Sequence, residues 1–322
     1  MAPPYQNVLS LFCQKTFEMK SPEMPLFMPF FQTLSLSKCS YKGCGQKMNI
    51  NQTQVGITAD ALVVLRSEPN LIKETKIRDP FASYFVTEGG RKFVEEASSI
   101  DPNYVEFNLA RFQYITHRIE QLVPNFKQMI VPGSGYDTRP LWMPAFSKGD
   151  IHVYEIDQED ILLSKQVVLT QREISIPHWL HFLPQDLAAR GLLSNLTENG
   201  FHKNEPTLVV MEGLIFFLPP ELNQELLHPD FFGLSPGSIV IFDYWTNDRI
   251  QIKNSHLYPR LGRDLFSRLP FEGDPELFSL TLKRMGYSKV EILPIEQITS
   301  IFYPQMVETE TPKAWFVVQA TV

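Results

Sequence analysis

The chain has 322 residues, of which 43% are hydrophobic and 20% are charged, so it has the size and composition of a globular protein with a large core. Its formal net charge of -7 argues against broad binding to a nucleic-acid backbone, which requires clustered lysines and arginines. No run of about 20 apolar residues is present and the 3 cysteines are sparse and odd in number, so we expect no membrane span and a reduced, cytoplasmic protein.

The sequence pattern divides the chain into an extension and one domain. Residues 1–52 mix Pro, Ser, Lys, Met and Phe without sustained periodicity, which predicts a partly ordered extension. Residues 53–322 are expected to form a single domain. It would comprise a helical cap over residues 53–124 and an α/β core over residues 125–322.

Two segments of the predicted cap have helical periodicity. Thr58–Arg66 and Tyr104–Leu122 carry apolar residues three and four positions apart, as a helix that covers a core would. Asp101 is a candidate N-cap with Pro102 at the first helical position, and Pro124 marks the end of the helical region.

The core begins with short apolar strands that alternate with helices, which predicts a parallel sheet buried on both faces. The predicted strands are Met129–Val131, His152–Ile156, Leu180–Phe182, Leu208–Met211 and Ser238–Phe242. The predicted helices between them are Gln158–Glu173, Asp186–Asn199 and Pro220–Leu227.

The C-terminal region departs from this alternation. Lys289–Ile295 and Lys313–Thr321 have the pattern of two strands, with no convincing helix between them. An antiparallel final strand fits such an arrangement. The prediction is therefore a seven-stranded, mostly parallel sheet whose last strand is antiparallel.

Ligands of open α/β sheets bind at the carboxyl ends of the strands, so the residues that follow each strand are the candidates for a site. Gly133-Ser134-Gly135 follows the first strand, and its glycines permit positive φ and close approach of a ligand to the backbone. A simple tight turn would use the same residues. The glycines alone therefore leave both interpretations open.

Acidic residues follow the next three strands. Glu155-Ile156-Asp157 ends the second strand, and Asp157, 22 positions after Gly135, has the spacing of an acid that binds ribose hydroxyls. Gln185-Asp186-Leu187 follows the third strand and offers groups that can recognise an adenine edge. Asp157 and Asp186 could instead cap helices. Glu212 is a lone carboxylate at the end of the fourth strand, and burial of such a charge without a partner is costly.

The loop after the first strand distinguishes between two nucleotide-like cofactors. A nicotinamide dinucleotide favours a third glycine, which lets its pyrophosphate sit at a helix N-terminus. Here Thr138 replaces that glycine, and Asp137 would repel a phosphate. S-adenosylmethionine has no phosphate and carries cationic groups that suit acidic neighbours. We therefore expect S-adenosylmethionine, and no metal, because Cys39 and Cys44 have no further ligand at suitable spacing.

The combined motifs resemble the leucine carboxyl methyltransferase family, which includes protein phosphatase 2A carboxyl methyltransferases and bacterial O-methyltransferases. The similar segments are Arg78-Asp79-Pro80-Phe81, Asn108-Leu109-Ala110-Arg111-Phe112, the string Gly133-Ser134-Gly135-Tyr136-Asp137-Thr138-Arg139, Tyr154-Glu155-Ile156-Asp157-Gln158, Glu212-Gly213-Leu214 and Leu218-Pro219-Pro220-Glu221. The resemblance implies a Rossmann-like class I methyltransferase fold.

Carried over by position, the resemblance implies specific contacts with the cofactor. Arg111 would bind its carboxylate, Asp137 would support the glycine loop or the ammonium group, and Asp157 would bind the ribose. Asp186 and Leu187 would flank the adenine, and Glu212 would lie near the methionine part. Two positions depart from the family pattern: Phe217 replaces a frequent Tyr, and Pro132 precedes the glycine loop.

The sequence favours a carboxylate as methyl acceptor, either of a small molecule or of a peptide C-terminus. A carboxylate is ionised at neutral pH, whereas a phenol with a pKa near 10 benefits from a base. No compelling base is present, since His152, His178 and His181 fit surface or packed positions. Tyr244 and Trp245 either line the acceptor site or belong to the core. O-methylation of a phenol, an NAD-dependent oxidoreductase and a non-catalytic nucleotide-binding protein remain the alternatives.

Overall fold

The structure is a computed structural model that describes residues 54–67, 78–100, 103–246, 274–304 and 315–322. The extension predicted for residues 1–52 and the helix start predicted at Asp101 and Pro102 lie outside these ranges. Within the described part of the chain, no helix has the length and apolar character that a membrane crossing requires.

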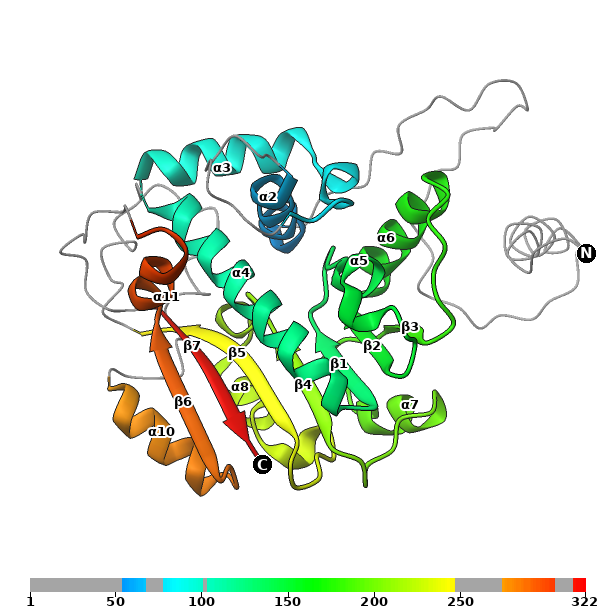
Figure 1. The fold of residues 1–322 in the computed structure, drawn as a ribbon, viewed down its shortest axis with the longest axis vertical. Coiled ribbons are helices and arrows are strands. Elements are labelled where there is room, and N and C mark those ends of the chain that lie inside the picture. Colours follow the sequence, from blue (N-terminus) through cyan, green and yellow to red (C-terminus); the bar gives the residue numbers. More distant parts are fainter. Residues whose placement is uncertain (1–53, 68–77, 101–102, 247–273, 305–314) are drawn as a thin grey trace, which may run out of the picture. The chain divides into compact units, whose positions relative to one another are not determined.

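The described residues form one sheet of seven strands in the order β3-β2-β1-β4-β5-β7-β6 (Figure 1). The strands are β1 Gln128–Pro132, β2 His152–Asp157, β3 Leu180–Pro184, β4 Thr207–Met211, β5 Ile239–Trp245, β6 Lys289–Pro294 and β7 Trp315–Thr321. Strands β1 to β5 pair in parallel, and β7 pairs antiparallel with both β5 and β6. The predicted mostly parallel sheet with an antiparallel last strand is confirmed.

Helices cover both faces of this sheet. They are α2 Gln54–Ser67, α3 Glu88–Ile100, α4 Tyr104–Leu122, α5 Arg139–Trp142, α6 Glu159–Gln171, α7 Leu192–Glu198, α8 Pro220–Leu226, α10 Pro275–Arg284 and α11 Ile295–Phe302. Successive β1 residues point to opposite faces, so Met129 and Val131 pack in the core with α4 and α11. Ile130 packs in the second core with α7, α8 and α10.

The N-terminal helices form the predicted cap. Residues of α2, α3 and α4 share the first of these cores with residues of β1, β4 and β5. A smaller cluster joins the cap to α6 through Val63, Ala82, Phe85 and Leu169, all at most 4% exposed. The cap is therefore fixed to the α/β core by buried apolar contacts on more than one side.

The C-terminal prediction was wrong in one respect, because helix α11 lies between β6 and β7 in the sequence. Ile295 and Ile298 are fully buried in the core that α4 also joins, so tertiary packing stabilises this eight-residue helix. Its several β-branched residues, following directly on a strand, made the segment resemble an extended chain. The helix predicted at Asp186–Asn199 is also shorter than expected, since Gly191 with φ of 96° precedes the start of α7.

Candidate cofactor-binding site

A cavity of about 310 Å³ opens at the carboxyl ends of the central strands, beneath the helical cap. Its lining combines residues of α2, α3 and α4 with the loops that follow β1 to β4 and with the ends of β5 and β7. Ten of the eleven residues predicted from the sequence line this cavity: Arg111, Gly133, Ser134, Gly135, Asp137, Asp157, Gln185, Asp186, Leu187 and Glu212. Glu155 does not.

The loop after β1 has the backbone conformation that its glycines permit. Gly133 and Gly135 have φ values of 62° and 49°. A Cβ atom on Gly133 would lie 2.6 Å from Cδ1 of Leu214, so a larger residue there would require the Leu214 side chain to move. Asp157 at the end of β2 anchors the loop, because its Oδ2 accepts a 2.7 Å hydrogen bond from the backbone N–H of Gly135.

Asp157 is held by backbone contacts on both sides. Its Oδ1 accepts a 2.8 Å hydrogen bond from the N–H of Gln158, while Oδ2 binds Gly135. Burial raises the pKa of Asp157, although the two backbone hydrogen bonds oppose this shift. The side chain therefore lies at a fixed position on the cavity wall with lone pairs remaining on both oxygens.

Glu212 is not a lone carboxylate, since it lies between two buried guanidinium groups. Arg111 donates from Nε to Oε1 over 3.2 Å, and Arg139 donates from Nη2 to Oε2 over 2.5 Å. Burial would raise the pKa of Glu212, but the charges of Arg139 and Arg111 hold it below its usual value. Arg111 also binds Asp243 over 2.8 Å, and Arg139 binds Asp137 over 3.0 Å.

Several lining residues carry a buried polar atom that has no hydrogen-bond partner among the described residues. They include Nε of Arg66, Nη2 of Arg111 and Oγ of Ser134. Arg111 is only 2% exposed, and an unpaired donor on a buried guanidinium is costly. An anionic group of a ligand in this cavity would satisfy Arg111, and a polar group of the same ligand would satisfy Ser134.

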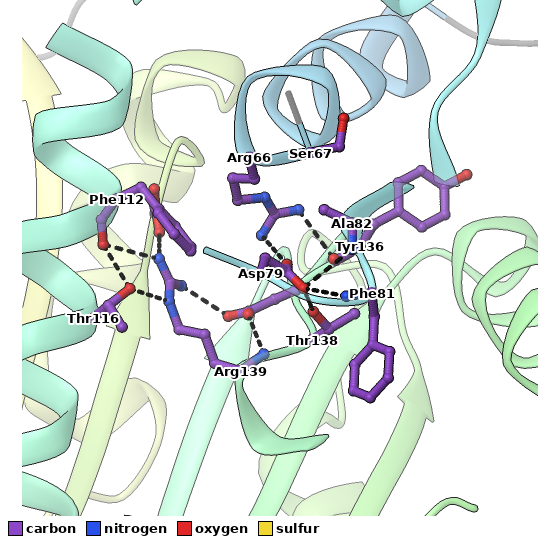
Figure 2. A network of polar contacts seen from close by, with 12 residues as sticks. Arg66, Ser67, Asp79, Phe81, Ala82, Phe112, Thr116, Tyr136, Thr138 and Arg139 are labelled. Carbon is purple, nitrogen blue, oxygen red and sulfur yellow. Dashed lines mark hydrogen bonds and ion pairs between the residues drawn. The ribbon is translucent and has the colours of Figure 1, made fainter. Parts of the chain in front are cut away.

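Asp79 links the cap to the glycine loop (Figure 2). Its Oδ1 accepts a 2.6 Å hydrogen bond from the hydroxyl of Thr138 and bonds of 3.0 and 3.1 Å from the N–H groups of Phe81 and Ala82. Its Oδ2 lies 3.7 Å from Nη1 of Arg66 in α2. One buried carboxylate therefore joins α2, the turn before η1 (Ala82–Phe85) and the residue at the end of the loop.

Glu155 lies beneath the loop in a fully buried pair with Lys165 of α6. The ammonium group of Lys165 donates both to the Glu155 carboxylate and to the main-chain oxygen of Asp137. Burial raises the pKa of Glu155 to about 7, despite the opposing charge of Lys165. Glu155 therefore does not line the cavity. It binds Lys165, which in turn holds the main chain of the loop at Asp137.

The residues after β3 also line the cavity. Leu187 is buried, Gln185 is half-buried and accepts a 3.2 Å hydrogen bond from Asn195, and Asp186 is exposed. Oδ1 of Asp186 accepts a 2.9 Å hydrogen bond from the N–H of Ala188, which closes a local turn. Asp186 is not the cap of α7, since that helix starts only after Gly191.

Sequence reasoning did not select several charged residues that organise the site. They are Arg66, Asp79, Arg139, Lys165 and Asp243, and each is at most 10% exposed at its side chain. A signal was present for Asp243, because a carboxylate inside an otherwise apolar strand needs a partner just as Glu212 does. Lys165 stands between Ser164 and Gln166 in α6 and offered no such signal.

The two aromatic residues at the end of β5 have different surroundings. Trp245 lines the cavity, whereas Tyr244 packs in the core with its ring 4.5 Å from that of Phe278 and 5.3 Å from that of Phe316. Phe217, which departs from the family pattern, also lines the cavity. None of the histidines in the described part of the chain is among the lining residues.

The sheet order, the antiparallel β7 and the placement of the glycine loop define a Rossmann-like class I methyltransferase fold. The "crystal structure of a putative methyltransferase" from Thermobifida fusca YX superposes with a TM-score of 0.53 and 14% identity, covering 83% of this chain and 93% of that chain. A DUF574 family protein from Streptomyces avermitilis MA-4680 superposes with a TM-score of 0.52 and 11% identity, covering 82% of this chain and 96% of that chain. At these identities the likeness concerns the fold alone.

The sequence profile named leucine carboxyl methyltransferase matches residues 58–229, and the chain belongs to this family. The "Putative S-adenosyl-L-methionine-dependent methyltransferase YktD" of Bacillus subtilis is 30% identical over 137 residues, which cover 42% of this chain and 44% of that protein. A relative from Mycolicibacterium smegmatis with the same type of name is 29% identical over 204 residues, which cover 58% of this chain and 66% of that protein. The chain thus spans less than two thirds of either relative. The family predicted from the motifs is confirmed, with S-adenosylmethionine as the cofactor of that family.

Proposed function

We propose that this protein is an S-adenosylmethionine-dependent O-methyltransferase that acts on a carboxylate. The cofactor would be held by the ten lining residues predicted from the sequence. The unpaired Nη2 of Arg111 would bind its carboxylate, and Asp157 would bind the ribose hydroxyls. Gln185, Asp186 and Leu187 would contact the adenine.

The charges of the site suit a ligand with cationic groups. The cavity lining carries three positive charges, on Arg66, Arg111 and Arg139, against four negative charges, on Asp137, Asp157, Asp186 and Glu212. A phosphate-bearing dinucleotide would meet this excess of carboxylates, so the arrangement favours a sulfonium and an ammonium group. When bound, the cofactor supplies a methyl group on sulfur, and its transfer forms one oxygen–carbon bond and breaks one sulfur–carbon bond, leaving the electron pair on sulfur.

The carboxylates that line the cavity are poor candidates for a proton acceptor, and this supports the choice of a carboxylate as methyl acceptor. The carboxylates of Asp137 and Glu212 have lowered pKa values because Arg139 offsets their burial, so they are weak bases. Burial raises the pKa of Asp157, but this side chain is assigned to the ribose hydroxyls, and Asp186 is an exposed side chain. A carboxylate acceptor is already ionised and needs no base, whereas a phenol would need one.

A labelled-methyl assay tests this proposal. Purified protein, S-adenosylmethionine with a labelled methyl group and a panel of carboxylic acids and phenols would be incubated, and the products treated with mild base. We expect label that base releases, as from a methyl ester. Label that resists base would indicate an ether and a phenolic acceptor, and binding of NAD without S-adenosylmethionine would indicate an oxidoreductase.

The carboxylate acceptor would be a small molecule or a peptide C-terminus.

We also propose a cytoplasmic location, which the sparse cysteines support. Fractionation of cells with an antibody to the protein tests the location, and recovery with membranes or in the medium would contradict it.

A further inference from the structure

One end of the cavity is formed by four aromatic residues, Phe216, Phe217, Trp245 and Trp315, which we call the aromatic wall. The rings of Phe216 and Trp245 are stacked, with centroids 4.5 Å apart and planes inclined by 21°. Trp315 meets Trp245 edge-on at 5.7 Å and 80°, and Phe217 meets Phe216 at 5.6 Å and 73°. The aromatic wall is therefore a continuous set of ring contacts from η4 (Ile215–Phe217) across β5 to β7.

The sheet order separates the aromatic wall from the residues proposed to hold the cofactor. The glycine loop, Asp157 and Asp186 follow β1, β2 and β3, which form one half of the sheet, whereas Trp245 and Trp315 lie on β5 and β7 in the other half. Arg111 marks the boundary, since its Nε binds Glu212 while its guanidinium carbon lies 5.0 Å from the centre of the Trp315 ring. A molecule against the aromatic wall would thus share the cavity with the cofactor.

Most polar atoms of the charged groups nearest to the aromatic wall have partners within the protein, and the exception, Nη2 of Arg111, is the atom assigned to the cofactor. Arg111 binds Glu212 and Asp243, and the indole N–H of Trp315 donates to Asp243 over 2.9 Å. The cap contributes further rings to the same cavity, Phe93 and Tyr104, whose centroids are 6.4 Å apart. A peptide would bring several backbone N–H and C=O groups against these apolar rings, where each unpaired group is costly.

We propose that the aromatic wall is the acceptor subsite and that the acceptor is a small carboxylic acid bearing an aromatic ring. Its ring packs against Trp245 and Phe216, and its carboxylate faces the half of the cavity assigned to the cofactor. Flat rings contact aromatic side chains more favourably than saturated rings of similar size do. This inference rests on the proposed function, because it assigns the acceptor of that same reaction.

The unmodified protein provides the first test through three probes. These are 3-phenylpropanoate, its saturated counterpart 3-cyclohexylpropanoate, and a leucine-terminated tripeptide, each assayed with labelled S-adenosylmethionine. We expect kcat/KM for the phenyl acid to exceed that for the cyclohexyl acid roughly 2- to 10-fold, the size of one aromatic pair contribution. The tripeptide should be the poorest acceptor. Equal rates for the two acids, or preference for the tripeptide, would overturn the assignment.

Variants then connect the preference to the aromatic wall. Trp245→Leu should raise KM for 3-phenylpropanoate about tenfold and remove the preference over the cyclohexyl acid, while Trp245→Phe should retain it. The dissociation constant for S-adenosylmethionine should stay the same in both. Tyr84→Leu, which removes an exposed aromatic ring outside the cavity lining, is the matched control and should leave every value unchanged. A preserved preference in Trp245→Leu would contradict the inference.

The two proposals fail in different ways. A protein that binds no S-adenosylmethionine would refute the proposed function itself, and the acceptor assignment with it. A protein that binds the cofactor and methylates the tripeptide or the cyclohexyl acid as well as the phenyl acid would overturn only the aromatic acceptor.

Discussion

Arg139 donates from Nη2 to Oε2 of Glu212 over 2.5 Å, which joins the residue after the glycine loop to the carboxyl end of β4. Arg139 is 1% exposed, and its Nε donates to Thr116 of α4 over 2.8 Å. The cap, the glycine loop and β4 therefore meet at one guanidinium group. The site is held in shape by ion pairs within the chain.

Replacement of Arg139 should destabilise the whole domain. Arg139→Met leaves Asp137 and Glu212 as buried carboxylates without this partner, and the loss of one member of a buried ion pair costs about 3–5 kcal/mol. Urea denaturation measures the change. Arg190→Met, at an exposed arginine, is the control and should change the unfolding free energy by less than about 0.5 kcal/mol. A similar small change for Arg139→Met would contradict the role of the network.

Two glycines with positive φ allow the effect of backbone strain to be distinguished from an effect on the cavity. Gly133→Ala and Gly191→Ala both place Cβ in the left-handed region, at φ of 62° and 96°, which costs about 1–2 kcal/mol. Only the first also drives Cβ to 2.6 Å from Leu214, which lines the cavity, while Gly191 has open space. Calorimetry should show weaker S-adenosylmethionine binding for Gly133→Ala alone. Equal weakening in both would refute a specific role for the loop.

Asp79 is expected to couple the cap to the glycine loop. Asp79→Asn removes the charge that faces Arg66 and weakens the bond from the Thr138 hydroxyl, so the unfolding free energy should fall by about 1–3 kcal/mol. Thr138→Val should reproduce part of this loss. If the two changes act through one contact, the double variant should lose less than the sum of the single variants. Strict additivity in a double-mutant cycle would show that the contact is not energetically coupled.

The Glu155–Lys165 pair should make stability depend on pH. The folded-state pKa of Glu155 is about 7, above its unfolded value of 4.5, so the folded state binds this proton more tightly. The stability that Glu155 contributes is therefore fully present below about pH 4.5 and is lost as pH rises through about 7. Glu155→Gln cannot titrate. The unfolding free energy of the native chain minus that of the variant should thus be larger at pH 4.5 than at pH 7.5, and a flat difference would contradict the raised pKa.

Much of the fold could be predicted because its signals are local. The apolar strands identified β1 to β5, and the 22-residue spacing from Gly135 to Asp157 corresponds to a direct hydrogen bond in the structure. The helix α11 could not be predicted in this way. Its eight residues have strand-like composition, and the packing of Ile295 and Ile298 in the core determines its conformation.

The ion pairs of the site depend on contacts between distant parts of the chain. Arg111 meets Asp243 across 132 residues, and Thr138 meets Asp79 across 59. A single sequence shows such charges without their partners, so Glu212 looked unpaired although two arginines bind it. The carboxyl ends of parallel strands gather at one edge, which is why most of the selected residues nevertheless line one cavity.

Isothermal titration calorimetry with S-adenosylmethionine tests the central claim most directly. The native chain should bind it with a dissociation constant within the roughly 1 μM–1 mM range common for enzyme ligands. Asp157→Ala should weaken binding at least about tenfold through loss of a charged hydrogen-bond acceptor, whereas Asp160→Ala, at an exposed carboxylate one turn away, should bind as the native chain does. An absence of binding to the native chain, or equal affinity in Asp157→Ala, would contradict the account.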